Sequence, residues 1–135
     1  KKNILVVGSD TIIYFNGKIL NKATNIKDAK KKILFMSGKI HKIYSSASVY
    51  YNNQEVWNNT QKTQIKIRKL NKKEINQYLS AARKQILSSV GCYQLESLGP
   101  NIIEDIKGDF FNVMGFPLFP FLKFLKKYKI KKIKT

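Results

Sequence analysis

The chain has 135 residues, of which 26 are basic and 8 acidic, so its formal charge of +18 favours anionic ligands. Only Arg68 and Arg83 are arginines. Arginine is the residue that recognises bases and phosphates with paired hydrogen bonds, so this scarcity argues against a specific nucleic-acid partner. The single cysteine, Cys92, excludes an internal disulfide, and no apolar run is long enough to cross a bilayer. We expect one domain, residues 1–135, in the cytoplasm and without a membrane partner.

The N-terminal part of the chain presents Asp10 directly after an apolar run. Residues 3–7 predict a buried strand that leads through a Gly-Ser pair to this aspartate. Ligands of open α/β sheets bind outside the carboxyl ends of strands, where a carboxylate can act as general base or metal ligand. Strands 11–15 and 18–20, joined by an Asn-Gly turn, would bring Lys22 back toward Asp10. An acid beside an ammonium suits a phosphate substrate, and the alternative is a solvated turn aspartate with an unrelated lysine.

Two helices are predicted from their capping residues. Asn25 followed by Asp28 indicates the start of one helix, which Gly38 ends. Asn71 followed by Glu74 has the spacing of a capping box, so a second helix should begin there and run to position 79 or onward to 87. Helices between strands favour an α/β fold, with a mixed β-sheet flanked by helices.

Strand patterns occupy the region between these helices. Residues 40–51 are rich in β-branched and aromatic residues, a second strand is expected around Trp57, and residues 64–70 alternate apolar and basic positions. Tyr50, Tyr51 and Trp57 could stack on a nucleobase or pack across the strands.

A glycine-bounded loop follows the second helix. Residues 91–99 contain Glu96, one of only eight acids in the chain, which is either a functional carboxylate or a surface acid. Asp109 favours a turn or helix cap over a catalytic role. His41 is expected to be structural or to lie near phosphate, and Cys92 to be a small packed residue.

The chain ends in a basic amphipathic segment. Pro117 is expected near the first turn of a final helix, and lysines crowd positions 123–134. We expect a helix docked on the core with a basic tail over 126–135, the alternative being a helix that lies on a membrane surface.

Five stretches together resemble the Maf family of nucleoside triphosphate pyrophosphatases. They are GSDTII, the lysine of ILNK, SGKIH, GCYQLESLG and GDFFNVMGFPL, and the likeness runs from about residue 3 to 125. The resemblance implies a fold related to the inosine triphosphate pyrophosphatases. It also implies hydrolysis of a nucleoside triphosphate to the monophosphate and pyrophosphate with a divalent cation, Mg²⁺ or Mn²⁺.

The resemblance also assigns roles to four residues. Asp10 is similar to the family's proton acceptor and would activate water or help to hold the metal. Thr11 resembles the neighbour that influences substrate choice, and Lys22 the lysine that faces the triphosphate. Glu96 resembles a base-recognising residue, and its carboxylate suits a guanine-like edge. This makes the chain more similar to the subgroup acting on 7-methyl-GTP, although Ser97 stands where that subgroup usually has glycine.

One family element has no counterpart in this sequence. Family members carry an N-terminal strand, a helix and a Ser-x-Ser-x-x-Arg phosphate-binding element before the strand at residues 3–7. We expect the chain to correspond to the C-terminal two-thirds of the family fold. The alternatives to an active pyrophosphatase are a catalytically impaired fragment and a basic nucleic-acid-binding module. The resemblance further suggests a homodimer.

Overall fold

The computed structural model describes residues 3–128 as a five-stranded sheet with helices at one end and along one strand. The strands lie in the order β2-β1-β3-β4-β5, and all four pairings are antiparallel. The α/β class expected from the sequence is confirmed; the expected mixed sheet contains only antiparallel pairs within the described residues. The elements are β1 (Leu5–Phe15), β2 (Lys18–Leu20), α1 (Ile26–Met36), β3 (Ile40–Tyr51), β4 (Gln54–Ile67), α2 (Lys72–Ala82), η1 (Arg83–Ser88), η2 (Gly99–Asn101), β5 (Ile103–Lys107), α3 (Phe110–Met114) and α4 (Leu118–Tyr128).

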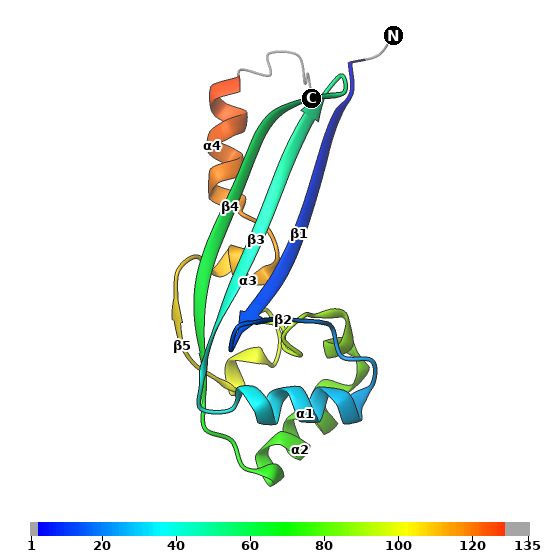
Figure 1. Cartoon of the computed structure of the whole chain (residues 1–135), viewed down its shortest axis with the longest axis vertical. Coiled ribbons are helices and arrows are strands. Elements are labelled where there is room, and N and C mark those ends of the chain that lie inside the picture. The colour runs from blue at the N-terminus through cyan, green and yellow to red at the C-terminus, as the bar shows by residue number, and fades with distance from the viewer. Residues whose placement is uncertain (1–2, 129–135) are drawn as a thin grey trace.

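The first strand differs from the prediction. Residues 5–7 and 11–15 belong to one continuous strand, β1, because the Gly-Ser pair between them stays in register with β3. Asp10 therefore lies within a strand and not at its end. Nor is the apolar run buried: Val6 and Val7 are 54% and 43% exposed. Helices α1 and α2 cover the opposite end of the sheet, where β1 also pairs with β2 through the predicted Asn16-Gly17 turn (Figure 1).

Strands β3 and β4 form a long hairpin. The predicted strand 40–51 is confirmed, and both turn residues, Asn52 and Asn53, have positive φ. The strand expected around Trp57 and the first part of the one expected over 64–70 are one 14-residue strand, β4, which ends at Ile67. The segment between them is polar and has a weak local preference for a strand. In the structure this segment continues the ladder opposite the serines of β3, so cross-strand pairing overrides the weak local preference.

Both predicted helix starts are confirmed. Asn25 accepts a hydrogen bond from the backbone N–H of Asp28 at the start of α1. Asn71 and Glu74 exchange both bonds of a capping box at the start of α2. Helix α2 ends at Ala82, because Arg83 takes a positive φ of 57°, and the continuation to position 88 is the 3₁₀ turn η1.

The main core lies where α1 and α2 pack on the lower half of the sheet. It is built from branched aliphatic side chains of three strands and the inner faces of the two helices. Its fully buried members include Ile13, Ile33, Met36, Ile65, Ile67, Ile75 and Ile102. This core fixes the end of β1 that follows Asp10, and so positions the cavity described below.

A smaller aromatic cluster attaches α4 to β4. Trp57 stacks on Phe124 with ring centroids 5.3 Å apart and contacts Phe121 edge-on at 5.8 Å. Trp57 thus packs against α4, a contact that the sequence did not predict, while it also lies opposite Val49 of β3 in the cross-strand position that the sequence did predict. The final helix begins at Leu118, directly after Pro117, as predicted. Of the expected basic tail, positions 129–135 lie outside the described residues. Within residues 3–128, no helix has both the length and the hydrophobicity needed to span a bilayer.

Candidate active site

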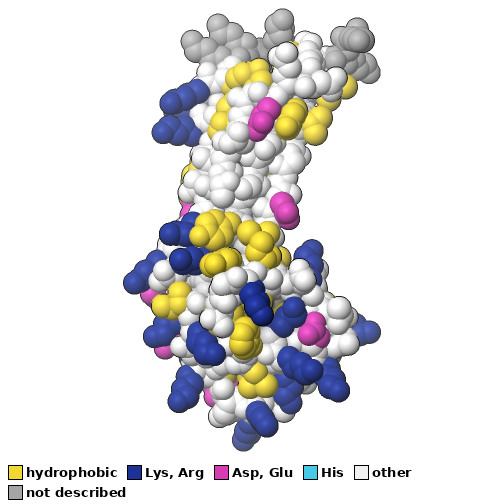
Figure 2. Space-filling view, in the orientation of Figure 1, with side chains coloured by type: hydrophobic (Ala, Val, Ile, Leu, Met, Phe, Trp, Pro, Cys, Tyr) yellow, Lys and Arg dark blue, Asp and Glu magenta, His cyan; other side chains and the backbone are white. Residues whose placement is uncertain are grey.

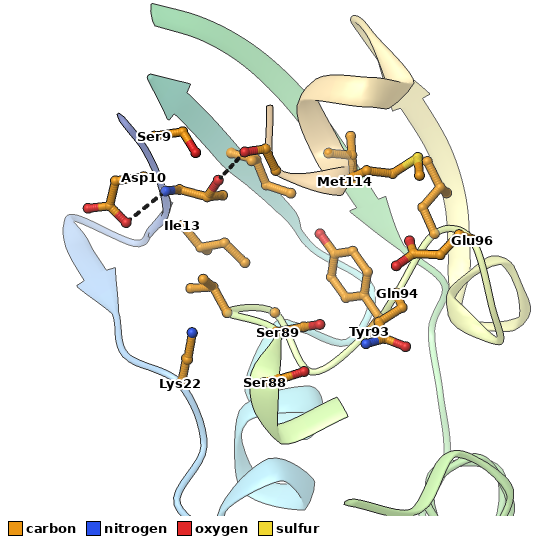
Figure 3. Close-up of a pocket in the computed structure, with 17 residues that line it drawn as sticks. Ser9, Asp10, Ile13, Lys22, Ser88, Ser89, Tyr93, Gln94, Glu96 and Met114 are labelled. Atoms are coloured by element: carbon orange, nitrogen blue, oxygen red, sulfur yellow. Dashed lines mark hydrogen bonds between the residues drawn. The ribbon is translucent and has the colours of Figure 1, made fainter. Parts of the chain in front are cut away.

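A cavity of about 280 Å³ opens between β1, the segment after β2, the loop that follows η1, and α3. Asp10, Thr11, Lys22 and Glu96 all line this cavity (Figure 3). The structure therefore brings together the four residues to which the family resemblance assigns roles. Asp10 and Lys22 lie at one side of the cavity in Figure 3, and Glu96 lies at the other. The volume is close to the lower end of the range for small-molecule sites, about 300–1,000 Å³.

Asp10 holds its carboxylate in a defined orientation. Its Oδ1 accepts a hydrogen bond from the backbone N–H of Thr11 at 2.9 Å. For Oδ2, no hydrogen bond is recorded within residues 3–128, and the residue is exposed. One oxygen thus fixes the side chain while the other is available to a ligand or to water.

The Thr11 side chain connects β1 to the end of α3. Its hydroxyl lies 2.9 Å from that of Ser45 and 3.2 Å from the carbonyl oxygen of Gly115, while Ser45 donates to the carbonyl of Asn112 at 2.8 Å. Two hydroxyl protons serve these three contacts, so the group is saturated as a donor. Gly115 ends α3 with a φ of 117°, which favours glycine, and lines the cavity. Thr11 therefore shapes the wall of the cavity through this link.

Lys22 projects from a segment that its neighbours hold in place. The carbonyl of Asn21 accepts a hydrogen bond from Lys32 of α1 at 2.7 Å, and Ala23 is buried in the core. The ammonium group is exposed, and it belongs to a strongly basic end of the molecule. Figure 2 shows lysines and arginines concentrated around the half that contains α1 and α2. An anion approaching the cavity meets a positive potential.

Glu96 lies in a tight loop. The carbonyl of Gln94 accepts hydrogen bonds from the N–H groups of Ser97 and Gly99, at 3.1 and 2.9 Å. A Cβ at Gly99 would lie 2.5 Å from that same carbonyl oxygen, so the loop requires glycine there. The loop holds an exposed carboxylate at the rim of the cavity.

The floor of the cavity contains a buried pair that the sequence did not reveal. Tyr93 lines the cavity, and its hydroxyl lies 2.7 Å from Nε2 of His41, a residue that is 1% exposed. Burial lowers the pKa of His41 from 6.5 to about 4 and raises the pKa of Tyr93. Both groups are neutral near pH 7, and His41 is structural, one of its two expected roles. Gly91 is the one sequence feature that could have indicated the buried position of Tyr93, because a Cβ at position 91 would lie 2.5 Å from the Tyr93 ring.

Two further candidates have structural roles. Cys92 is fully buried, and burial raises the pKa of its thiol to about 11, so it is the packed residue that the sequence predicted. Asp109 caps α3 by accepting hydrogen bonds from the N–H groups of Phe111 and Asn112. The expected helix-cap role of this aspartate is confirmed.

The carboxylates of the cavity suit one kind of metal site. Within residues 3–128, no cluster of three or more His, Cys, Asp or Glu side chains could enclose a metal ion. Mg²⁺ is commonly held by one or two carboxylates together with ligand phosphates and water. Asp10, with Oδ2 available, could serve as the carboxylate ligand of such a Mg²⁺ ion. The cavity does not fit a metal site built from protein ligands alone.

Comparisons with known proteins agree with the motifs. The family model described as "Maf-like protein" matches residues 1–128. A protein of Bartonella henselae named 7-methyl-GTP pyrophosphatase is 36% identical over 126 residues, which are 93% of this chain and 64% of the relative. One of Rhizobium johnstonii with the same name is 33% identical, covering 90% and 61%. A nucleoside triphosphate pyrophosphatase of Caulobacter vibrioides is 30% identical, covering 93% and 63%. The chain thus spans a little over three-fifths of the length of these relatives, and it belongs to the Maf family.

Proposed function

We propose that the protein hydrolyses a nucleoside triphosphate to the nucleoside monophosphate and pyrophosphate. The observation that carries this proposal is the arrangement of the cavity, with Asp10 and Lys22 on one side and Glu96 on the other. One side of the cavity presents the Lys22 ammonium and the Asp10 carboxylate to the phosphates. The other side presents the Glu96 carboxylate, which can accept hydrogen bonds from the base. The names of the relatives in three bacteria support the same reaction.

In the proposed reaction, Asp10 accepts the proton of the attacking water. The water oxygen bonds to the α-phosphorus, the bond from that phosphorus to the bridging oxygen breaks, and pyrophosphate leaves. Asp10 suits this step because Oδ1 is anchored on Thr11 while Oδ2 can reach water. Lys22 would offset the negative charge that develops on the phosphates. A divalent cation such as Mg²⁺ or Mn²⁺, held by Asp10 together with the phosphates, would neutralise part of that charge.

We further propose that Glu96 recognises the base. A carboxylate accepts hydrogen bonds from the ring N–H and the amino group of a guanine-like edge, whereas it repels the carbonyl oxygens of a uracil edge. This favours 7-methyl-GTP over UTP and dTTP, in line with the names of two of the relatives. Thr11 would act on substrate choice indirectly, through the wall that it holds at Gly115.

Product analysis tests the proposed reaction. The full product of the gene is incubated with 7-methyl-GTP, GTP, dTTP, UTP and CTP in Mg²⁺ or Mn²⁺, and the products are separated by anion exchange. We expect monophosphate and pyrophosphate in equal amounts, with 7-methyl-GTP consumed fastest and chelation of the metal stopping turnover. Release of the nucleoside diphosphate and inorganic phosphate would contradict the proposal. So would the absence of turnover in a protein shown to be folded.

A further inference from the structure

Three of the five hydroxyl groups that line the cavity are already engaged within the protein; those of Ser9, beside Asp10, and of Ser89 have no hydrogen bond within residues 3–128. The Thr11 hydroxyl binds Ser45 and Gly115, and the Tyr93 hydroxyl binds His41. Ser88 donates to the carbonyl oxygen of Gln85 at 2.8 Å, which uses the only proton that its hydroxyl has. The Thr11 and Ser88 hydroxyls cannot donate to a ligand without breaking a bond inside the protein.

Ser89 is different from its neighbour. It lines the cavity, is only partly exposed, and has no side-chain hydrogen bond recorded within the part of the chain that the structure describes. Its backbone is fixed, since its N–H donates to the carbonyl of Ile86 and its own carbonyl accepts from Cys92. A hydroxyl on a fixed backbone, with both its donor and its acceptor unused, is available to a ligand.

The position of Ser89 indicates which part of a nucleotide it meets. In Figure 3, Ser89 lies between Lys22 on one side and Glu96 on the other. If the phosphates of a nucleotide lie at Lys22 and its base lies at Glu96, its sugar lies next to Ser89. Phosphate oxygens only accept hydrogen bonds, and Lys22 supplies donors for them. A sugar hydroxyl both donates and accepts, and the free hydroxyl of Ser89 can complement it in either direction.

We propose that Ser89 binds one of the two ribose hydroxyls of the nucleotide, so that removal of this hydroxyl from the ligand weakens binding. The inference rests on the proposed function for the direction in which the nucleotide lies. It does not depend on catalysis, so it can be tested by binding of the monophosphate product. One neutral hydrogen bond of this kind corresponds to about a 3- to 10-fold difference in affinity.

The test compares two adjacent serines. Binding of GMP, 2′-deoxy-GMP and 3′-deoxy-GMP is measured calorimetrically for the full gene product, for Ser89→Ala and for Ser88→Ala. We expect Ser89→Ala to weaken GMP binding about 3- to 10-fold and to leave unchanged the deoxynucleotide that lacks the hydroxyl it contacts. Ser88→Ala should leave all three affinities unchanged, because its hydroxyl is occupied by Gln85. Thermal unfolding of both variants checks that the fold is intact.

Three results would overturn the inference. Equal weakening of all three nucleotides would make Ser89 a phosphate contact, and unchanged affinities would leave it without a role in binding. An equal effect of Ser88→Ala would refute the hydrogen-bond argument that separates the two serines. These outcomes are distinct from failure of the proposed reaction, in which GMP binds with the expected pattern but no triphosphate is cleaved.

Discussion

The buried histidine under the cavity predicts a specific loss of stability in mild acid. His41 is the only histidine in the chain, and burial lowers its pKa from 6.5 to about 4. Its Nδ1 has no hydrogen-bond partner, so protonation would leave a buried N–H without an acceptor. Between these two pKa values the unfolded chain binds a proton that the folded chain does not. Stability is therefore full above about pH 6.5 and falls as the pH drops toward 4.

The size of this loss follows from the two pKa values. From about pH 7.5 to about pH 5, the difference in proton binding removes about 2 kcal/mol of unfolding free energy. Ordinary carboxylates, with pKa values near 4, are still largely ionised over this range and add little. Urea unfolding at the two pH values measures the loss directly.

A variant without the titrating group provides the control. His41→Gln keeps an amide that can bond to the Tyr93 hydroxyl, and it should be less stable than wild type at about pH 7.5 but nearly independent of pH down to about 5. The reasoning would be refuted by a wild-type protein whose unfolding free energy is the same at both pH values. It would equally be refuted by a His41→Gln variant that retains the full loss.

Two further predictions concern the cavity. Gly91→Ala would push a Cβ to 2.5 Å from the Tyr93 ring and 2.8 Å from the Ile13 side chain, so it should cost about 1–3 kcal/mol of unfolding free energy and weaken nucleotide binding; unchanged stability in urea would contradict the packing argument. Glu96→Gln should lower the ratio of kcat/KM for 7-methyl-GTP over UTP by about tenfold, because charged hydrogen bonds are about twice as strong as neutral ones. An unchanged ratio would remove Glu96 from base recognition.

Local features of the fold were predictable from the sequence. The caps at Asn25 and Asn71 and the turn at Asn16-Gly17 are confirmed because each depends on residues a few positions apart. The length of β1 and β4 was not predictable. Both strands continue through polar or glycine-containing segments that are stabilised by pairing with β3. The local sequence pattern does not predict this pairing.

The sequence predicted which residues line the cavity better than it predicted how the fold positions them. The motifs identified Asp10, Thr11, Lys22 and Glu96, and all four line one cavity. The sequence placed Asp10 at a strand end, and the structure shows it within β1. The bond from Thr11 to Gly115 and the contact between His41 and Tyr93 span 104 and 52 positions, so no local pattern could indicate them.

The measurement that tests the central claim most directly is the rate of pyrophosphate release by Asp10→Asn in the full gene product. Asparagine keeps an oxygen for the Thr11 N–H but cannot accept the proton, so we predict a fall in kcat of about 10²- to 10⁴-fold in a protein that unfolds as wild type does. Asp105→Asn removes the same charge from an exposed position on β5, outside the cavity, and should keep the wild-type rate. A wild-type rate in Asp10→Asn would contradict the account.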